Sequence, residues 1–534
     1  MISAANPILP GCYPDPSICR VGDDYYLVAS TFEYLPGLPL MRSRDLVRWE
    51  TVGHAIDRTG MLEYDGIRSS GGLYAPTIRH DGERFWIVCT LVDPADDTRG
   101  GNFLITATDA AGPWSDPVGL DVDGIDPSVA FDDEGRVWMH GTRLARDPDW
   151  HHQTEVWVRE YSREEQALIG PEHVIWRGAV DGVVWAEGPH LYRIDGRWYL
   201  IAAEGGTEFH HAVSVARAEH VTGPYEGNRA NPIFTHRHLG RTADVIGAGH
   251  ADLIQAPDGS WQAVMLAMRA SDGHHYPLGR ETFLCPVAWE DGWPVFAPGV
   301  GRLEETVRIP WTDAVAPAGS WQPDDRVAGS VAPDDPRWTA LRALPEQIAT
   351  IETGTDGEST WLLPVRSTTL ADAADLAFLG VRQQHADVDA TVVLDVSALV
   401  VGETAGLVIR QSEDDHASVQ VTRMPGALRL RVVHRRSDVE TTLSERTVEL
   451  RDMVRLNVRA RGYEYVLVGD ADALAGEQSV LGTADGRELD ASSTGGFLGV
   501  WFGVFVTSHG QASQGSVRIA DFRYAPAVAA VTVP

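Results

Sequence analysis

Three carboxylates in the first 300 residues stand at equivalent places relative to the strands that follow them. Asp126 and Glu187 each lie eleven residues before the first residue of a strand that follows a turn, and Asp15 lies ten residues before one. Tyr74 and His250 take the same place in two further units. One carboxyl group can protonate a leaving oxygen, a second can activate water, and a third can keep the proton donor's pKa high. The set therefore predicts acid–base hydrolysis, and a glycosidic bond suits it best.

The elements that must position these residues form a repeat. Five turns rich in Asp and Gly are each followed by an aromatic or β-branched strand, and these strands begin 52 to 63 residues apart, at Tyr25, Phe85, Val137, Trp198 and Trp261. Asp-Gly between such runs is a hairpin signal. Five units of about four short strands are typical of a β-propeller, in which the first strand of each blade lines the central channel. We therefore expect the five equivalent residues to converge at one end of the channel.

Each acid taken alone could be an ordinary turn residue before Pro or Gly, as in Asp15-Pro16. Three acids in one register favour a functional site, because crowded carboxylates raise one another's pKa and sites keep such strain for a purpose. Nearby aromatic residues could support a sugar ring or belong to the core; they are Phe32, Tyr34, Tyr74 and Trp185.

Other hydrolytic chemistries fit the sequence less well. Metal hydrolysis would need His and Asp clustered at ligand spacing. The three adjacent His pairs, among them His210-His211, are interpreted as loop or surface residues, because neighbours on a strand point to opposite faces. The sequence has no Gly-x-Ser-x-Gly elbow and no lysine, which removes Schiff-base chemistry and the P-loop lysine.

Composition limits the partners and the compartment. The 534 residues include 76 acidic and 44 basic side chains, a net charge of −32 that disfavours nucleic acid and anionic membrane surfaces as partners. Four cysteines without a C-x-x-C pair predict reduced, buried thiols. We expect a cytoplasmic protein, because no secretory signal and no apolar run of about 20 residues is present. The oligomeric state does not follow from the composition, and a homo-oligomer stays open.

The second half has a different pattern. We expect the propeller to span residues 1–310, a Pro- and Asp-rich linker or surface wrap to span 311–336, and an all-β sandwich to span 337–534. Short alternating strands such as 390–394 and 428–433, separated by turn residues, support the sandwich. This domain could serve stability alone or could reach the channel mouth.

Several motifs together resemble family 43 of the glycoside hydrolases, most closely its two-domain β-xylosidases. The resemblance covers nearly the whole chain, including 378–385 and 405–411 in the second half, and its first-half motifs are Tyr13-Pro14-Asp15-Pro16, Gly124-Ile125-Asp126-Pro127-Ser128, Ala186-Glu187-Gly188-Pro189-His190 and Leu278-Gly279-Arg280-Glu281-Thr282. The resemblance implies a five-bladed propeller followed by a concanavalin-like jelly roll. It also implies an inverting, exo-acting hydrolase that releases terminal xylose from short β-1,4-xylo-oligosaccharides.

The resemblance also implies roles. Asp15 would be the general base, Glu187 the general acid and Asp126 the pKa modulator. The expected sugar-binding residues are Phe32, Tyr74, Thr207, Arg280 and Trp501. A loop of the sandwich, residues 496–501, would bring Trp501 or Phe497 to the channel mouth. The chemistry would need no cofactor, although a structural calcium ion could bind near His250, and the partner would be a small oligosaccharide.

Departures from the family pattern leave the substrate open. Tyr74 stands where a Trp is common, and the segments 38–41 and 207–211 also differ from the xylosidase pattern. An α-L-arabinofuranosidase or a bifunctional xylosidase/arabinofuranosidase is therefore a close alternative. Arg146-Asp147-Pro148 superficially resembles a motif of fructosidase-type propellers, which are retaining enzymes. This alternative is set aside because the tripeptide lies outside the repeat register. Outside the enzymes, the alternative is a non-catalytic sugar-binding propeller.

Overall fold

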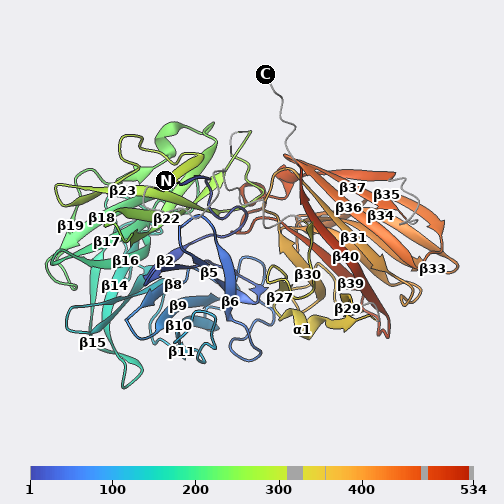
Figure 1. The fold of residues 1–534 in the computed structure, drawn as a ribbon, viewed down its shortest axis with the longest axis horizontal. Helices are drawn as coiled ribbons and strands as arrows, with labels where there is room; N and C mark the ends of the chain where they lie inside the picture. Colours follow the sequence, from blue (N-terminus) through green and yellow to red (C-terminus); the bar gives the residue numbers. More distant parts are fainter. Residues whose placement is uncertain (1, 273, 310–328, 355–356, 471–478, 528–534) are drawn as a thin grey trace.

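The computed structural model describes residues 2–272, 274–309, 329–354, 357–470 and 479–527. These residues form two β-rich domains that lie side by side (Figure 1). Helix in this part of the chain is limited to single turns, such as α1 (Pro345–Ile348) and α2 (Ala491–Thr494). None of the helices among these residues is long and apolar enough to span a membrane.

The first domain is a five-bladed propeller, as the repeat predicted. Within the described residues each blade is an antiparallel sheet, and the first strand of each blade packs against the first strands of both neighbouring blades. Blade 1 contains β2 (Ser17–Val21), β3 (Asp24–Val28), β5 (Gly37–Ser43) and β6 (Glu50–Ile56). Blade 2 contains β8 (Thr77–His80), β9 (Phe85–Val92), β10 (Gly100–Ala107) and β11 (Val118–Gly119), with β7 (Gly72–Leu73) beside β9.

The remaining blades follow in chain order. Blade 3 contains β12 (Ile125–Phe131), β13 (Val137–Leu144), β14 (Thr154–Ser162) and β15 (Ala167–Trp176). Blade 4 contains β16 (Glu187–Ile194), β17 (Arg197–Glu204), β18 (Ala212–Ala218) and β19 (Glu226–Gly227), with β20 (Phe234–Thr235) beside β18. Blade 5 contains β21 (Val245–Gln255), β22 (Trp261–Arg269), β23 (Glu281–Glu290) and β24 (Trp293–Phe296).

The Asp-Gly turns form the hairpins between the first and second strands of the blades. Oδ1 of Asp81 accepts hydrogen bonds from the backbone N–H groups of Glu83 and Arg84, at 3.0 and 2.9 Å. Oδ1 of Asp258 accepts one from Ser260 at 3.0 Å. These side chains supply the turn with acceptors, which is why Asp is favoured there.

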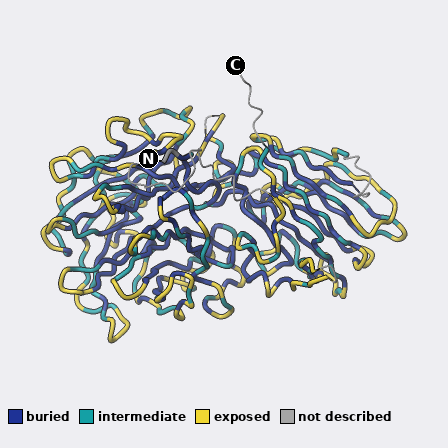
Figure 2. Tube along the Cα trace, viewed as in Figure 1, coloured by how far each residue is buried: buried dark blue, intermediate teal, exposed yellow. Residues whose placement is uncertain are grey.

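Apolar side chains fill the space between neighbouring blades. Clusters of buried residues join blades 1 and 2, 2 and 3, 3 and 4, 4 and 5, and 5 and 1. Figure 2 shows the strands mainly buried and the connecting loops exposed. The blades are thus held together by burial of apolar surface, which leaves polar positions of the first strands free to face the channel.

The ring closes along a seam between blade 1 and blade 5. The N-terminal strand β1 (Ile2–Ala5) pairs with β25 (Thr306–Ile309), outside the five blades. After β1, Asn6 and Leu284 of β23 exchange two hydrogen bonds of 2.9 and 3.0 Å, and Leu9 and Thr282 exchange two of 3.2 Å. The segment that leads to Asp15 is therefore hydrogen-bonded to blade 5.

The second domain is a sandwich of two antiparallel sheets around one core. One sheet runs in the order β28 (Thr350–Thr353), β29 (Ser359–Pro364), β40 (Ser516–Pro526), β31 (Val388–Asp395), β36 (Met453–Arg461), β37 (Glu464–Asp470) and β38 (Ser479–Asp485). The other runs in the order β30 (Ala377–Arg382), β39 (Trp501–Thr507), β32 (Thr404–Arg410), β33 (His416–Met424), β34 (Ala427–Arg436) and β35 (Val439–Glu449).

Two short strands lie near the junction of the domains. Of the expected linker 311–336, residues 311–328 lie outside the described residues, and β26 (Gly329–Ser330) pairs with β40 of the sandwich. Strand β27 (Ala340–Leu341) pairs with β4 (Tyr34–Leu35) of the propeller. This pairing brings the sandwich directly against the segment that carries Phe32.

Candidate active site

The structure brings together the five residues that the repeat register selected. Asp15 and Tyr74 precede β2 and β8, Glu187 is the first residue of β16, and Asp126 and His250 lie within β12 and β21. Nδ1 of His250 is 3.7 Å from Oδ1 of Asp15. The backbone N–H of Gly188, next to Glu187, donates a hydrogen bond of 3.0 Å to Oδ2 of Asp126. Equivalent positions of the blades therefore meet at one end of the channel.

The local backbone at these positions is strained. Asp15, Asp126 and His250 have φ angles of 54°, 52° and 49°, in the left-handed region that non-glycine residues seldom adopt. The pairing register of the first strand also shifts at Asp126, after Glu187 and at His250. Bulges and left-handed residues re-aim side chains and gather at functional sites.

Asp15 is held as a carboxylate by its neighbours. It is buried, with Nη1 of Arg280 donating to Oδ1 at 2.8 Å and the hydroxyl of Ser30 donating to Oδ2 at 2.6 Å. Burial raises the pKa of Asp15. The charges of Arg280 and His250 and the hydrogen bond from Ser30 outweigh this effect and bring the pKa below its ordinary value. An ionised carboxylate can accept a proton from water.

Glu187 is shifted in the opposite direction. Burial, followed by the negative charges of Asp126 and Asp15, raises the pKa of Glu187 well above its ordinary value. Burial also raises the pKa of Asp126, to about 6. Glu187 stays partly exposed, so a ligand can reach it. A carboxyl group that keeps its proton at neutral pH can donate it to a leaving oxygen.

An aromatic wall, which we define as Phe32, Tyr74 and Phe497, stands beside these carboxyl groups. Ring centroids are 5.5 Å apart for Phe32 and Tyr74, 6.0 Å for Phe32 and Phe497, and 5.7 Å for Tyr74 and Phe497. The guanidinium of Arg280 lies 5.6 Å from the centroid of Phe32 and 5.3 Å from that of Phe497. Arg280 also donates to the hydroxyl of Thr207 at 3.3 Å. The expected residues Phe32, Tyr74, Thr207 and Arg280 therefore cluster near Asp15. Phe32 is only 2% exposed, so the rings of the wall that a ligand can reach are those of Tyr74 and Phe497, which are partly exposed.

The structure favours Phe497 over Trp501 as the aromatic residue that the sandwich supplies. The ring of Trp501 stacks on Tyr34 with centroids 4.0 Å apart and planes at 6°, and only 1% of the residue is exposed. Trp501 therefore lies inside the contact between the domains, and the expectation that it binds sugar is corrected. Phe497, which precedes β39, is partly exposed at the aromatic wall.

His211 is a neighbour of the site that the sequence did not reveal. The sequence predicts a loop or surface position for its His-His pair, but His211 is buried, with Nδ1 2.9 Å from the carbonyl oxygen of Gly247 in β21. A Cβ atom on Gly249 would come within 2.4 Å of this ring, so the approach depends on glycine. Burial lowers the pKa of His211 to about 4, which makes it a neutral group beside Asp15 and His250.

A second polar layer joins all five blades. Ser17, Ser128 and Asp252 lie in the first strands, two residues after Asp15, Asp126 and His250. Asp252 accepts from Ser17 at 2.7 Å, from Tyr192 at 2.6 Å and from Arg79 at 2.8 and 3.0 Å. His190 is 3.1 Å from Ser128 and 3.2 Å from Arg79. This buried network fixes the first strands of the blades relative to one another.

The side chains around His250 do not fit a calcium site. Calcium takes six to eight oxygen ligands. The carboxylate nearest to His250 is Asp15, whose oxygens already bind Arg280 and Ser30. No group of three or more His, Cys, Asp or Glu side chains in the described ranges is placed to hold a metal ion. The expected calcium therefore has no support from these residues, and no step is assigned to it.

Comparisons with known proteins agree with this geometry. The family profile "Glycosyl hydrolases family 43" matches residues 4–294, and the profile "Beta xylosidase C-terminal Concanavalin A-like domain" matches residues 334–525. The chain therefore belongs to family 43 of the glycoside hydrolases and is a glycosidase with a propeller and a concanavalin-like second domain.

Full-length relatives carry two kinds of name. The chain is 37% identical to a xylosidase/arabinosidase of Butyrivibrio fibrisolvens, over 98% of this chain and 99% of the relative. It is 34% identical to a non-reducing end α-L-arabinofuranosidase of Bacteroides ovatus, over 95% and 92%. The crystal structure of a xylan β-1,4-xylosidase from Bacillus halodurans matches with a TM-score of 0.87 at 30% identity, over 98% of this chain and 100% of that chain.

Proposed function

We propose that this glycosidase removes terminal xylose from short β-1,4-xylo-oligosaccharides with inversion at the anomeric carbon. The observation that carries the proposal is the meeting of three carboxyl groups at one end of the channel, where Asp15 binds Arg280 and Asp126 accepts a hydrogen bond from the residue after Glu187. Their surroundings lower the pKa of Asp15 and raise that of Glu187, so the first is favoured as a base and the second as an acid. Such separation of two carboxyl groups is what acid–base glycoside hydrolysis requires.

The proposed reaction is a single displacement. Asp15 removes a proton from a water molecule, and the water oxygen attacks the anomeric carbon. As the bond to the leaving oxygen breaks, Glu187 donates its proton to that oxygen. Asp126 keeps the pKa of Glu187 high through its negative charge. The products are the shortened oligosaccharide and free xylose with inverted configuration, and no cofactor takes part.

The aromatic wall and Arg280 support sugar binding at this place. Aromatic faces suit the apolar face of a pyranose, and the guanidinium of Arg280 can donate to sugar hydroxyl groups. Phe497 comes from the sandwich, so the second domain stands at the end of the channel, an arrangement that favours attack on a chain end. The names of the xylosidase relatives support xylose as the sugar released.

Arabinofuranoside cleavage is the second candidate. The Bacteroides ovatus relative named as an arabinofuranosidase is 34% identical over 95% of this chain, and the Butyrivibrio fibrisolvens relative carries both activities in its name. A bifunctional enzyme would act on both sugars with the same carboxyl groups.

The test compares initial rates on p-nitrophenyl β-D-xylopyranoside and p-nitrophenyl α-L-arabinofuranoside, with Glu187→Ala as the control. We expect the xyloside to be hydrolysed faster and the variant to lose about 10²- to 10⁴-fold in kcat. A faster arabinofuranoside would change the substrate and keep the mechanism. If the parent hydrolyses neither glycoside but still binds xylose, the result favours the non-catalytic sugar-binding propeller.

Stereochemistry provides an independent check. Proton NMR of the first product from the xyloside should show α-xylose before mutarotation. Initial β-xylose would indicate retention and would contradict the single displacement.

A further inference from the structure

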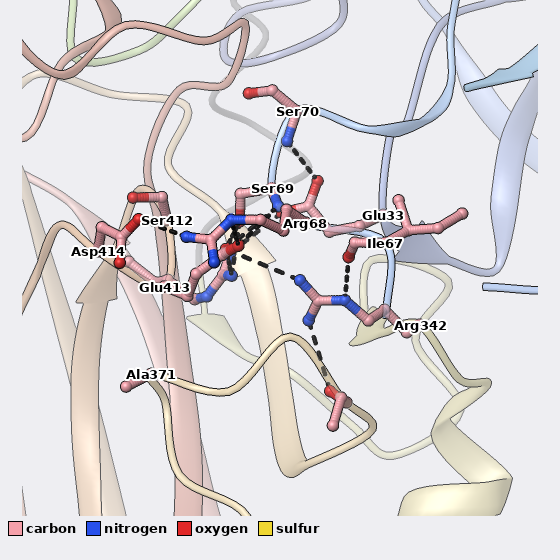
Figure 3. A network of polar contacts seen from close by, with 12 residues as sticks. Glu33, Ile67, Arg68, Ser69, Ser70, Arg342, Ala371, Ser412, Glu413 and Asp414 are labelled. Carbon is pink, nitrogen blue, oxygen red and sulfur yellow. Dashed lines mark hydrogen bonds and ion pairs between the residues drawn. The ribbon is translucent and has the colours of Figure 1, made fainter. Parts of the chain in front are cut away.

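Ser70 is hydrogen-bonded to two residues of the aromatic wall and to the residue that follows the third. Its backbone N–H donates to Oε2 of Glu33, the residue after Phe32, at 3.2 Å (Figure 3). Its carbonyl oxygen accepts a hydrogen bond of 2.9 Å from the hydroxyl of Tyr74. Its own hydroxyl accepts one of 2.9 Å from the backbone N–H of Phe497. Ser70 is buried and has a φ of 68°, so a strained residue joins its own segment, which also carries Tyr74, to the distant segments of Glu33 and Phe497.

The segment that carries Phe497 begins with two glycines in the left-handed region. Gly495 and Gly496 both have a φ of 78°, and glycine gives the chain there little stiffness of its own. A Cβ atom on Gly496 would lie 2.4 Å from Oγ of Ser70, so glycine is required for the close approach. The hydrogen bond from Phe497 to Ser70 is therefore the first of three backbone contacts that hold this segment against the propeller; Gly499 and Val500 follow it with bonds to Cys12 and to the carbonyl oxygen of Pro277.

A buried ion network anchors Ser70 in turn. Arg410 of the sandwich lies 3.3 Å from both Glu33 and Glu413, and the side chains of all three are at most 1% exposed. The backbone N–H of Ser69 donates to Glu413 at 3.1 Å, and Nη2 of Arg410 donates to the Ser69 hydroxyl at 2.8 Å. The network thus joins the Ser69–Ser70 turn of the propeller to the end of β32, as Figure 3 shows for Ser69, Glu33 and Glu413.

We propose that Ser70 is a positioning residue that sets the orientation of Phe497, and with it the substrate affinity of the site. It acts through the hydrogen bond between its hydroxyl and the Phe497 N–H and has no part in proton transfer. The inference rests on the proposed function, because it assumes that the aromatic wall binds the sugar. Because the buried network joins the sandwich to the Ser69–Ser70 turn, the position of the sandwich also affects the geometry of the aromatic wall.

The test uses Ser70→Gly, which removes the hydroxyl while glycine accepts the left-handed backbone. Ser437→Gly is the matched control, since Ser437 has a φ of 46° in the turn between β34 and β35 and lies outside the site. Rates are measured on whichever of the two aryl glycosides the parent hydrolyses faster. We expect Ser70→Gly to raise KM about fivefold, the effect of one lost hydrogen bond, with kcat and both limbs of the pH profile unchanged. Ser437→Gly should match the parent.

A double-variant cycle separates positioning from a general structural effect. If Ser70 acts through Phe497, adding Ser70→Gly to Phe497→Ala should raise KM no further, because coupled residues are not additive. An unchanged KM in Ser70→Gly, or KM effects that multiply in the double variant, would overturn the positioning role. If the unmodified protein hydrolyses neither glycoside, the proposed function is overturned. This result needs no variant, so it is distinguishable from a failure of the positioning role.

Discussion

Arg280 donates a hydrogen bond of 2.8 Å to Asp15, although 265 residues separate the two in the chain. Arg280 immediately precedes β23 of blade 5, and Asp15 precedes β2 of blade 1. The guanidinium also contacts Thr207 and faces the rings of Phe32 and Phe497. One side chain therefore connects the carboxylate proposed as the base with the surface proposed to bind sugar.

Replacing Arg280 should move the acidic limb of the pH–rate profile. The charge of Arg280 lowers the pKa of Asp15, so Arg280→Gln should raise that pKa. Activity that needs ionised Asp15 is lost as the pH falls through this pKa, so the limb moves to higher pH. The shift should be about one pH unit in kcat/KM, with a higher KM as well. An acidic limb that stays in place would show that Asp15 is not the group that titrates there.

Replacing Asp126 should move the alkaline limb. Burial is the largest cause of the raised pKa of Glu187, and the negative charge of Asp126 is the second. Asp126→Asn removes this charge and leaves a side chain of nearly the same size. The pKa of Glu187 should fall, and activity that needs its proton should be lost at lower pH. The pH dependence of kcat/KM measures the shift, and Asp132→Asn, in the hairpin turn of the same blade, is the control. Equal alkaline limbs in the parent and Asp126→Asn would remove the modulator role.

Two aromatic residues of the sandwich should have different effects. Phe497→Ala should raise KM severalfold and leave the thermal midpoint close to that of the parent, because Phe497 is partly exposed at the aromatic wall. Trp501→Ala should lower the midpoint, because removing a buried Trp costs about 3–5 kcal/mol. Kinetics and thermal unfolding of both variants provide the comparison. A rise in KM with Trp501→Ala at unchanged stability would reverse the assignment.

Breaking the ion network between the domains should destabilise the protein. Arg410→Met leaves Glu33 and Glu413 buried with less compensation, and breaking such a group costs about 3–5 kcal/mol. Arg436→Met is the control, since Arg436 pairs with Glu488 at the surface, with 54% and 34% of the side chains exposed. Exposed pairs contribute about 0–1 kcal/mol. Similar thermal midpoints for the two variants would contradict the structural importance of the buried group.

The parts of the site that the sequence predicted are those that local periodicity encodes. A propeller repeats a hairpin turn before each second strand, so counting back from Phe85 or Trp198 reaches equivalent places in every blade. Asp126 and Glu187 could be found in this way, as could Asp15, because the fold converts equal spacing into a shared height in the channel. The sandwich could be predicted because the alternation of apolar and polar residues along its strands is also a local pattern.

The parts that the sequence missed depend on contacts that no local pattern records. The choice between Phe497 and Trp501 follows from the close approach of Gly496 to Ser70, which are 426 residues apart. The buried ring of His211 occupies space that a side chain on Gly249 of β21 would fill. The Arg410–Glu33 pair also joins distant segments, and neither residue differs in sequence from an ordinary surface charge.

The seam of the ring has a consequence for how the enzyme loses activity. Asp15 and Arg280 stand on opposite sides of the junction that Asn6 and Leu9 hold closed against β23. Local opening of this junction would separate the two while every blade kept its own sheet. Inactivation on heating should therefore precede the loss of β structure, and amide exchange in residues 6–13 should report the functional lifetime of the enzyme better than its global unfolding does.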